Sequence, residues 1–248
     1  MKYPVYVISL ERDTKRRQNL KKQFQSYDEF EIIDAVDGSK MPSKEYYEYM
    51  INSLTEYSIL LAPNEVACSL SHIKAYEKFL NSEAKYCLIL EDDVIGSDEC
   101  INKAFELAEK LPKNSIFHCG KRKSLETILG KKENDNLILV SKFAHYLLTG
   151  AFAYVLDRKI AQILLDTQRN TLCEADNYKF FSQKINFNLY YTDIFHHEDL
   201  TEENSNLQIS RNQRAIADKK IIQPKHSTKL RWLRFKDKYL SGNKYFQI

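Results

Sequence analysis

The sequence predicts an α/β fold with a mixed, mostly parallel sheet flanked by helices. Short apolar runs that suit buried strands alternate with segments in which apolar residues recur at helical spacing. The chain opens with a strand–helix–strand unit, the crossover that neighbouring parallel strands require. Its 248 residues and 43% hydrophobic content are enough for one packed domain. We place this domain at residues 1–215 and a basic amphipathic tail at residues 216–248.

The first half of the chain alternates strands and helices. Asp13 can cap a helix that begins at Thr14, and its inner face carries Leu20 and Phe24. Asn64 can cap a longer amphipathic helix that continues to Leu80. Strands are predicted at residues 5–10, 30–33 and 86–90, and a tyrosine-rich helix at residues 45–57.

The second half continues the alternation as far as residue 192. A helix can start at Asp98 and stop at Pro112, and Asp157 can cap another. A further helix is predicted at residues 174–183. The predicted strands are residues 115–119, 137–143, 150–156 and 187–192, with a polar, basic loop at 121–136.

Composition and missing motifs exclude several classes of protein. The chain has six glycines and no GxGxxG, Walker A, GxSxG or HExxH pattern, which argues against dinucleotide, P-loop, hydrolase-elbow and zincin sites. Its five cysteines show no metal-ligand spacing and suit a reducing compartment. No leader and no membrane-spanning apolar run is evident. We therefore expect a cytoplasmic protein.

Three consecutive acids follow the apolar run at residues 86–90. These acids are Glu91, Asp92 and Asp93. Open α/β sheets bind ligands at the carboxyl ends of their strands, and clustered carboxylates there require a cation. Carboxylate oxygens suit Mg²⁺ or Mn²⁺, which bridge phosphate oxygens. The alternative is an ordinary acidic loop.

Two other segments carry residues that suit a ligand pocket. Arg12, Arg16 and Arg17 stand near the start of the first helix, where cations and the helix dipole together suit a diphosphate. The alternative is a solvated basic helix face. Ser71 and His72 lie on the helix before the acids and suggest a pocket wall, although His72 can equally be a structural histidine.

Short sequence motifs follow one another in a fixed order over roughly residues 3–210. They are Val7-Ile8-Ser9-Leu10 with the arginines, Asp34-Ala35-Val36-Asp37-Gly38, Asn64 to His72, Glu91 to Val94, Gly150 to Tyr154 with residues 157–161, Glu174-Ala175-Asp176-Asn177, and Asn204-Ser205. In this order they resemble glycosyltransferase family 25, the bacterial lipooligosaccharide galactosyltransferases and their relatives. Asn64 replaces a usual Gly and Ala151 a common Thr, and these departures put the donor sugar in doubt.

The resemblance implies a GT-A-like nucleotide-diphospho-sugar fold in the 1–215 domain. It implies inverting, metal-dependent transfer of a hexose, most often from UDP-galactose, to a glycan hydroxyl in lipooligosaccharide or lipopolysaccharide biosynthesis. UDP-glucose and UDP-N-acetylhexosamine are the alternative donors. The cofactor would be Mn²⁺ or Mg²⁺.

The resemblance also implies roles for individual residues. The metal ligands would be Asp93, Glu91 and either His196 or His197, unless these histidines are merely exposed in a loop. The general base would be Asp176, with Glu174 behind it, unless Asp176 is only a first-turn helix acid. The donor-binding residues would be Val7, Ser9, Leu10, Arg12, Arg16, Asp34, Ala35, Ser71, His72, Glu91, Asp92 and Gly150.

The basic tail suggests where the acceptor lies. Its last thirty residues interleave nine Lys and Arg with aromatic residues such as Trp232 and Phe235, which suits the anionic cytoplasmic face of an inner membrane. We expect peripheral contact there with a lipid-linked oligosaccharide acceptor, unless the tail is solvated or packs on the domain. Two competing hypotheses are a metal-dependent phosphatase or nuclease and a non-catalytic nucleic-acid-binding protein. A net charge of only +3 argues against nucleic acid as a partner.

Overall fold

The computed structural model describes residues 1–57, 60–121, 129–134, 137–197 and 246–247. Their strands form one ten-stranded sheet. The strands are β1 (Val5–Ser9), β2 (Glu31–Asp34), β3 (Tyr86–Glu91), β4 (Val94–Ile95), β5 (Ser115–Gly120), β6 (Leu129–Asn134), β7 (Leu137–Val140), β8 (Ala153–Asp157), β9 (Asn188–His197) and β10 (Phe246–Gln247).

The central strands confirm the prediction of a mixed, mostly parallel sheet. The order is β10-β6-β7-β9-β5-β8-β3-β1-β2, and β4 pairs separately with β9. β1 is parallel to β2 and β3, and β5 is parallel to β9. Because β8 is antiparallel to both β3 and β5, the strands β2, β1, β3, β5 and β9 all run in one direction. Their carboxyl ends therefore meet at one edge.

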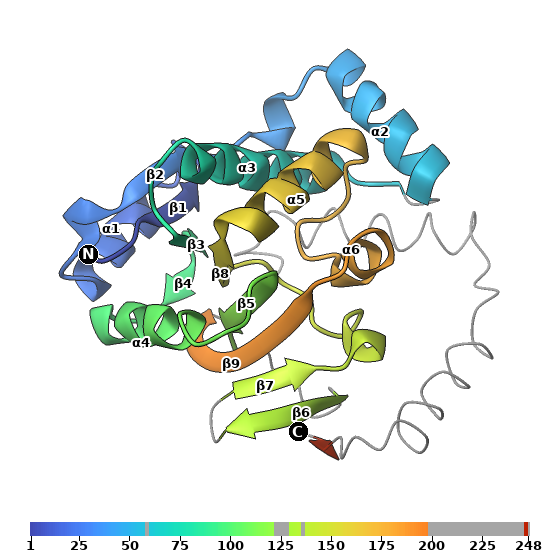
Figure 1. Cartoon of the computed structure of the whole chain (residues 1–248). Helices are drawn as coiled ribbons and strands as arrows, with labels where there is room; N and C mark the ends of the chain where they lie inside the picture. Colours follow the sequence, from blue (N-terminus) through green and yellow to red (C-terminus); the bar gives the residue numbers. More distant parts are fainter. Residues whose placement is uncertain (58–59, 122–128, 135–136, 198–245, 248) are drawn as a thin grey trace.

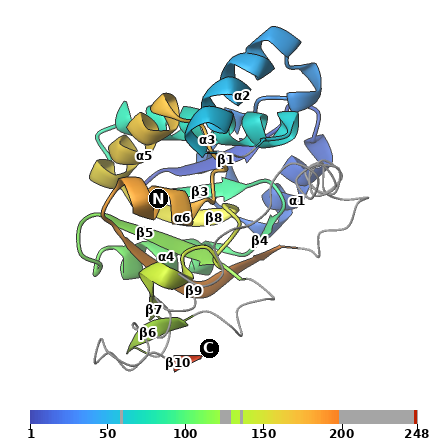
Figure 2. The same cartoon turned by 90° about the vertical axis from the view of Figure 1, so that its right-hand side faces the viewer.

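Helices cover both faces of this sheet (Figure 1). They are α1 (Thr14–Gln23), α2 (Ser43–Tyr57), α3 (Pro63–Leu80), α4 (Asp98–Ala108), α5 (Arg158–Asn170) and α6 (Tyr178–Lys184), with short 3₁₀ turns at Tyr27–Glu29, Gly38–Lys40 and Lys142–Ala144. Figure 2 shows the same layers from the side, with α2 outside α3.

The two faces of the sheet belong to separate apolar cores, because successive strand residues point to opposite sides. In β1, Tyr6 and Ile8 pack with α3, α5 and α6. Val5 and Val7 pack with Leu20 of α1 and with the buried face of α4. All five residues of β1 are buried, as the continuous apolar run predicts for a central strand.

Several predicted helix starts are confirmed. The helix after Asp13 begins at Thr14, although the Asp13 side chain makes no capping hydrogen bond. Asp157 caps α5, because its Oδ1 accepts from the Ile160 amide at 2.8 Å. Asn64 is not a cap, because α3 begins one residue earlier at Pro63, which suits the first helical position.

The chain after residue 170 differs most from expectation. The helix predicted at residues 174–183 begins only at Tyr178, and Asn177 caps it by accepting from the Phe180 amide at 3.1 Å. Residues 174–176 therefore form a turn rather than a helix. The last predicted strand continues to His197, because β4 pairs with its end. The predicted basic loop at 121–136 contains β6.

The predicted tail is described only at Phe246 and Gln247, which form β10 against β6 at the edge of the sheet (Figure 2). The Asn204-Ser205 motif and the rest of the tail lie outside the described residues. Within the described part of the chain, no helix combines the length and the apolar character that crossing a bilayer requires.

Candidate functional site

A cleft opens where the parallel strands end. It has about 1240 Å³ of empty space, part of it open to solvent. Its walls come from the residues that follow β1 and β2, one face of α3, the acids at the end of β3, and His197 at the end of β9. Residues 150–152 and 174–176 close the remaining side. The edge of the sheet that α/β proteins use for ligands is thus also the hollowed edge here.

Most of the predicted site residues line this cleft together. They are Ser9, Leu10, Arg12, Arg16, Ala35, Ser71, His72, Glu91, Asp92, Asp93, Gly150, Glu174, Asp176 and His197.

Three predicted residues do not line it. Val7 is fully buried in the core beneath the cleft. Asp34 points outward with 79% of its side chain exposed and pairs with Arg17 at 3.3 Å. His196 lies on the solvent side of β9, with Nε2 3.9 Å from Asp193 Oδ1. Successive side chains of β9 point to opposite faces of the strand, so His196 and His197 lie on different sides. His197 stands in the cleft against the Phe152 ring.

The three acids differ in their surroundings. Arg16 Nη1 donates to Asp92 Oδ1 at 2.7 Å and lies 3.8 Å from Asp93 Oδ2. Burial raises the pKa of Asp92 even though Arg16 opposes the rise. Burial, followed by the nearby charge of Glu91, raises the pKa of Asp93 to about 7. The cluster thus holds more negative charge than one guanidinium offsets, and it would bind a cation favourably.

Asp93 also carries an unpaired atom. Its Oδ1 is buried and has no hydrogen-bond partner in the described part of the protein. A buried acceptor without a partner costs free energy unless a ligand or ion completes it. This oxygen is therefore suited to a metal ion.

Arginines surround the end of β1. Arg12 forms an ion pair with Asp37 at the mouth of the cleft. Arg17 donates to the Ser9 hydroxyl at 3.0 Å and to the Ser9 carbonyl at 3.1 Å. Arg12 and Arg16 line the cleft together with Asp13, the residue before α1. Cations beside a helix N-terminus suit a phosphate group.

The serines of α3 hold loops of the cleft in place. Ser71 Oγ accepts from the Val36 amide at 2.8 Å and donates to the Ala67 carbonyl at 2.7 Å. Ser69 donates to the Cys173 carbonyl at 2.7 Å, just before residues 174–176. The helix face that carries Ser71 and His72 was predicted to form a pocket wall, and here Ser69 and Ser71 also position the segments opposite the helix.

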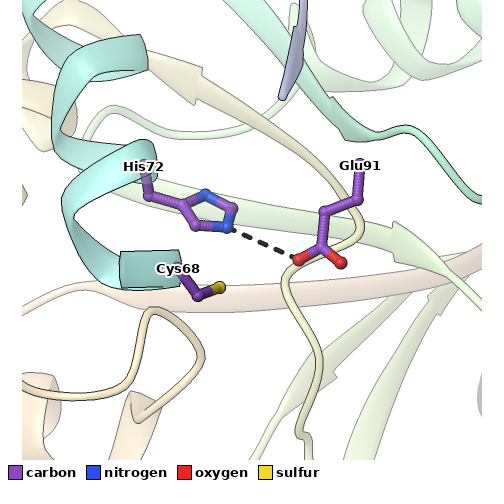
Figure 3. A group of neighbouring side chains, drawn as sticks. All are labelled: Cys68, His72 and Glu91. Carbon is purple, nitrogen blue, oxygen red and sulfur yellow. Dashed lines mark ion pairs between the residues drawn. The ribbon is translucent and has the colours of Figure 1, made fainter. Parts of the chain in front are cut away.

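His72 is fully buried beneath the cleft and is held by two tyrosines. Its Nδ1 lies 2.7 Å from the Tyr154 hydroxyl, which donates to the Tyr76 hydroxyl at 3.1 Å. Its Nε2 faces Glu91, 3.5 Å from Oε1, and Cys68 stands on the adjacent turn of α3 (Figure 3).

Asp176 lies between the cleft and a second hollow. The Gly150 amide donates to Asp176 Oδ2. Glu174 stays close by, accepting from Asn177 Nδ2 at 2.9 Å. The second hollow has about 800 Å³ of empty space, and its other lining residues include Tyr146. Both Glu174 and Asp176 line both spaces, so a carboxylate there can reach ligands on either side.

Sequence reasoning missed three contributors to the site. Cys68 lies four residues before His72, a spacing that puts both on one helix face, so this spacing was a usable signal. Phe152 packs edge-on against His197, with the ring centroids 4.6 Å apart. Gly38 allows close packing on α3, because a Cβ there would lie 2.5 Å from Asn64 Oδ1. Phe152 and Gly38 belong to the sequence motifs at residues 150–154 and 34–38, but nothing local in the sequence indicates these two contacts.

Comparison with known proteins gives consistent results. The family described as "Glycosyltransferase family 25 (LPS biosynthesis protein)" matches residues 2–179. Procollagen galactosyltransferase 2 of Mus musculus is 28% identical over 118 residues, 45% of this chain and 19% of the mouse protein. The lipooligosaccharide biosynthesis protein lic2B of Haemophilus influenzae is 30% identical over 115 residues, 42% of each chain. The matched segments thus span less than half of these relatives.

A distant likeness to solved structures is also found. A glycosyltransferase involved in glycosylation of the major capsid of PBCV-1 superposes with a TM-score of 0.41 at 12% identity, over 81% of this chain and 96% of that one.

Proposed function

The chain belongs to glycosyltransferase family 25, and from this premise we propose that it transfers a hexose from UDP-galactose to a glycan hydroxyl with inversion. The observation that carries the proposal is the cleft, which combines three carboxylates, two arginines and a helix N-terminus at one sheet edge. Names of relatives support the sugar and the acceptor class, since one is a galactosyltransferase and another a lipooligosaccharide biosynthesis protein. UDP-glucose and UDP-N-acetylhexosamine are the alternative donors.

Asp93, Glu91 and His197 would hold Mn²⁺ or Mg²⁺. The unpartnered Asp93 Oδ1 and the raised pKa of that carboxyl fit such an ion. His197 replaces the His196 alternative in this proposal, because only His197 lines the cleft. When bound, the ion would offset the charge of the departing diphosphate.

The basic residues would bind and orient the donor. Arg12 and Arg16 lie where they can pair with the two phosphates, and Arg16 is held in place by Asp92 at 2.7 Å. The backbone of Ser9 and Leu10 and the turn at Ala35 would contact the base. With these groups fixed before binding, the sugar carbon would face the Asp176 side of the cleft.

Asp176 would act as the general base. Inversion by a single displacement requires a base on the side of the sugar away from the diphosphate, so the acids of the β3 end are unsuitable. Asp176 reaches both the cleft and the second hollow, and an acceptor in that hollow would present its hydroxyl there. Glu174 is the second candidate. The Gly150 amide, which donates to Asp176, would keep the carboxylate oriented.

Turnover of a panel of UDP-sugars, measured as UDP release with Mn²⁺, tests this proposal. Asp93→Asn should lose both turnover and metal-dependent UDP binding. Asp176→Asn should lose turnover but keep UDP binding. Asp166→Asn, at an exposed position of α5, is the matched control and should keep both.

Two results would contradict parts of the proposal. Retained turnover in Asp176→Asn refutes the assignment of the base. A thermal shift with GDP or CMP but none with UDP refutes the donor.

The lipid-linked acceptor and membrane contact rest on the tail at residues 216–248. Its basic and aromatic residues suit the anionic cytoplasmic face of a membrane. Co-sedimentation of the full chain with anionic vesicles should exceed that of a chain ending at residue 215. Equal sedimentation of the two chains would refute the membrane contact.

A further inference from the structure

We propose that Cys68, His72 and Glu91 form a zinc site in the wall of the cleft, which shares only Glu91 with the site proposed for Mn²⁺ or Mg²⁺. One sulfur, one nitrogen and one oxygen atom from these residues lie within 4.8 Å of one another. Figure 3 shows the three side chains converging from α3 and from the end of β3.

Local structure brings the ligands together. Cys68 and His72 are four residues apart on α3, so their side chains lie on the same helix face. Glu91 is the last residue of β3, which packs beneath that face. Bonds of about 2.0–2.3 Å to a tetrahedral zinc would place the ligand atoms about 3.5 Å apart. A shift of about 1 Å in the Cys68 and Glu91 side chains therefore closes the site.

His72 is oriented for metal binding. The Tyr154 hydroxyl donates to Tyr76, so it accepts from Nδ1–H of His72. In a neutral imidazole this places the lone pair on Nε2, which is buried and has no hydrogen-bond partner among the described residues. That lone pair faces a carboxylate oxygen 3.5 Å away, and two acceptors in such an arrangement need a positive charge between them. Metal-binding histidines are commonly held through their other nitrogen in this way.

The donor set favours zinc over the harder cations. Mn²⁺ and Mg²⁺ prefer oxygen ligands, whereas a thiolate and an imidazole suit Zn²⁺. Cys68 lies in no disulfide and lines the cleft. Binding converts its thiol to a thiolate, and the proton passes to solvent. Three protein ligands leave the fourth position for water.

The consequence for transfer rests on the proposed function. Glu91 belongs to both sites, so a zinc ion on Cys68 and His72 would draw it away from Asp93. Zinc would then inhibit binding of UDP with Mn²⁺.

Metal titration of the full-length, metal-free chain tests the site. Zn²⁺ binding is measured by competition with a chromophoric chelator, and Co²⁺ serves as the spectroscopic probe. Wild type should bind one Zn²⁺, and its Co²⁺ complex should show thiolate-to-metal charge-transfer absorption. Cys68→Ser should weaken binding about tenfold or more and lose this absorption. Cys100→Ser, at another partly buried cysteine whose thiol donates to the Ile194 carbonyl, is the matched control and should behave as wild type.

A second variant separates this site from the proposed function. Asp93→Asn should lose UDP binding with Mn²⁺ yet retain Zn²⁺ binding and the cobalt spectrum. Equal zinc affinity of wild type and Cys68→Ser, or a cobalt complex without the charge-transfer band, would overturn the inference. Zinc bound as expected by a chain that fails to bind UDP would refute the proposed function alone. Undiminished binding of UDP with Mn²⁺ in the presence of zinc would overturn the proposed inhibition.

Discussion

Replacing Asp93 by Asn should stabilise the metal-free protein at alkaline pH. The Asp93 side chain is only 24% exposed, and its Oδ1 has no partner among the described atoms. Burial and the charge of Glu91 raise its pKa from 3.8 to about 7. The folded chain therefore binds this proton more tightly than the unfolded chain does.

The sign and size of the effect follow from this difference. A raised folded-state pKa contributes stability that is fully present below about pH 4 and is lost as the pH rises to about 7. Over this window the Asp93 contribution falls by about 1.4 kcal/mol per pH unit, or about 4 kcal/mol in all. Asn carries no ionisable group, so Asp93→Asn removes this dependence. Between about pH 5 and pH 8 the stability of the variant relative to wild type should rise by about 3 kcal/mol.

Urea denaturation followed by circular dichroism, in the presence of EDTA, measures this difference. Asp166→Asn serves as the control for an exposed acid and should track the wild type at every pH. Adding Mn²⁺ at alkaline pH should stabilise wild type and leave Asp93→Asn unchanged. Identical pH profiles for wild type and Asp93→Asn would refute the claim that burial penalises this charge.

Three further substitutions test side-chain hydrogen bonds that stabilise the fold. Arg16→Ala should destabilise the protein by about 3 kcal/mol at neutral pH, because it leaves the buried Asp92 carboxylate unpaired, and urea denaturation should show recovery in acid. No loss at neutral pH would contradict this pairing. Asp157→Ala should cost about 1 kcal/mol in the same assay through the lost cap of α5, and an unchanged midpoint would refute that role. Tyr154→Phe should cost about 1–3 kcal/mol by removing the buried partner of His72, which wild-type stability in the variant would exclude.

The strand β3 with its terminal acids and the β1–α1–β2 unit were predictable, because local sequence signals and the fold agree there. An apolar run of five residues that ends in carboxylates has few other arrangements in an α/β protein, and β3 ends at Glu91 as expected. The start of α5 followed from Asp157, whose side chain caps it. Such signals act over three or four residues and depend little on the rest of the chain.

The turn that carries Glu174 and Asp176 was not predictable in the same way. Its acids suggested a helix start, but the cap is Asn177, and the segment is held by the Gly150 amide and by Ser69 from α3. These contacts join positions 26 and 104 residues apart. Tertiary contacts of this kind override local propensity.

His196 and His197 show that single side chains are subject to the same limit: tertiary contacts decide their positions. His196 and His197 were equivalent in the sequence as loop residues. Pairing of β9 with β4 makes them alternate strand positions, and only His197 turns into the cleft. The pairing register decides which face of the sheet a strand residue points to. Here the register depends on the two-residue strand β4, which lies more than a hundred positions away in the sequence.

A crystal of the full chain soaked with UDP and Mn²⁺ tests the central claim most directly. We predict an anomalous manganese peak beside Asp93 and Glu91, with the diphosphate between it and the arginines of the cleft. A diphosphate bound elsewhere, or a cleft that holds nucleotide with no manganese at the end of β3, would contradict the claim.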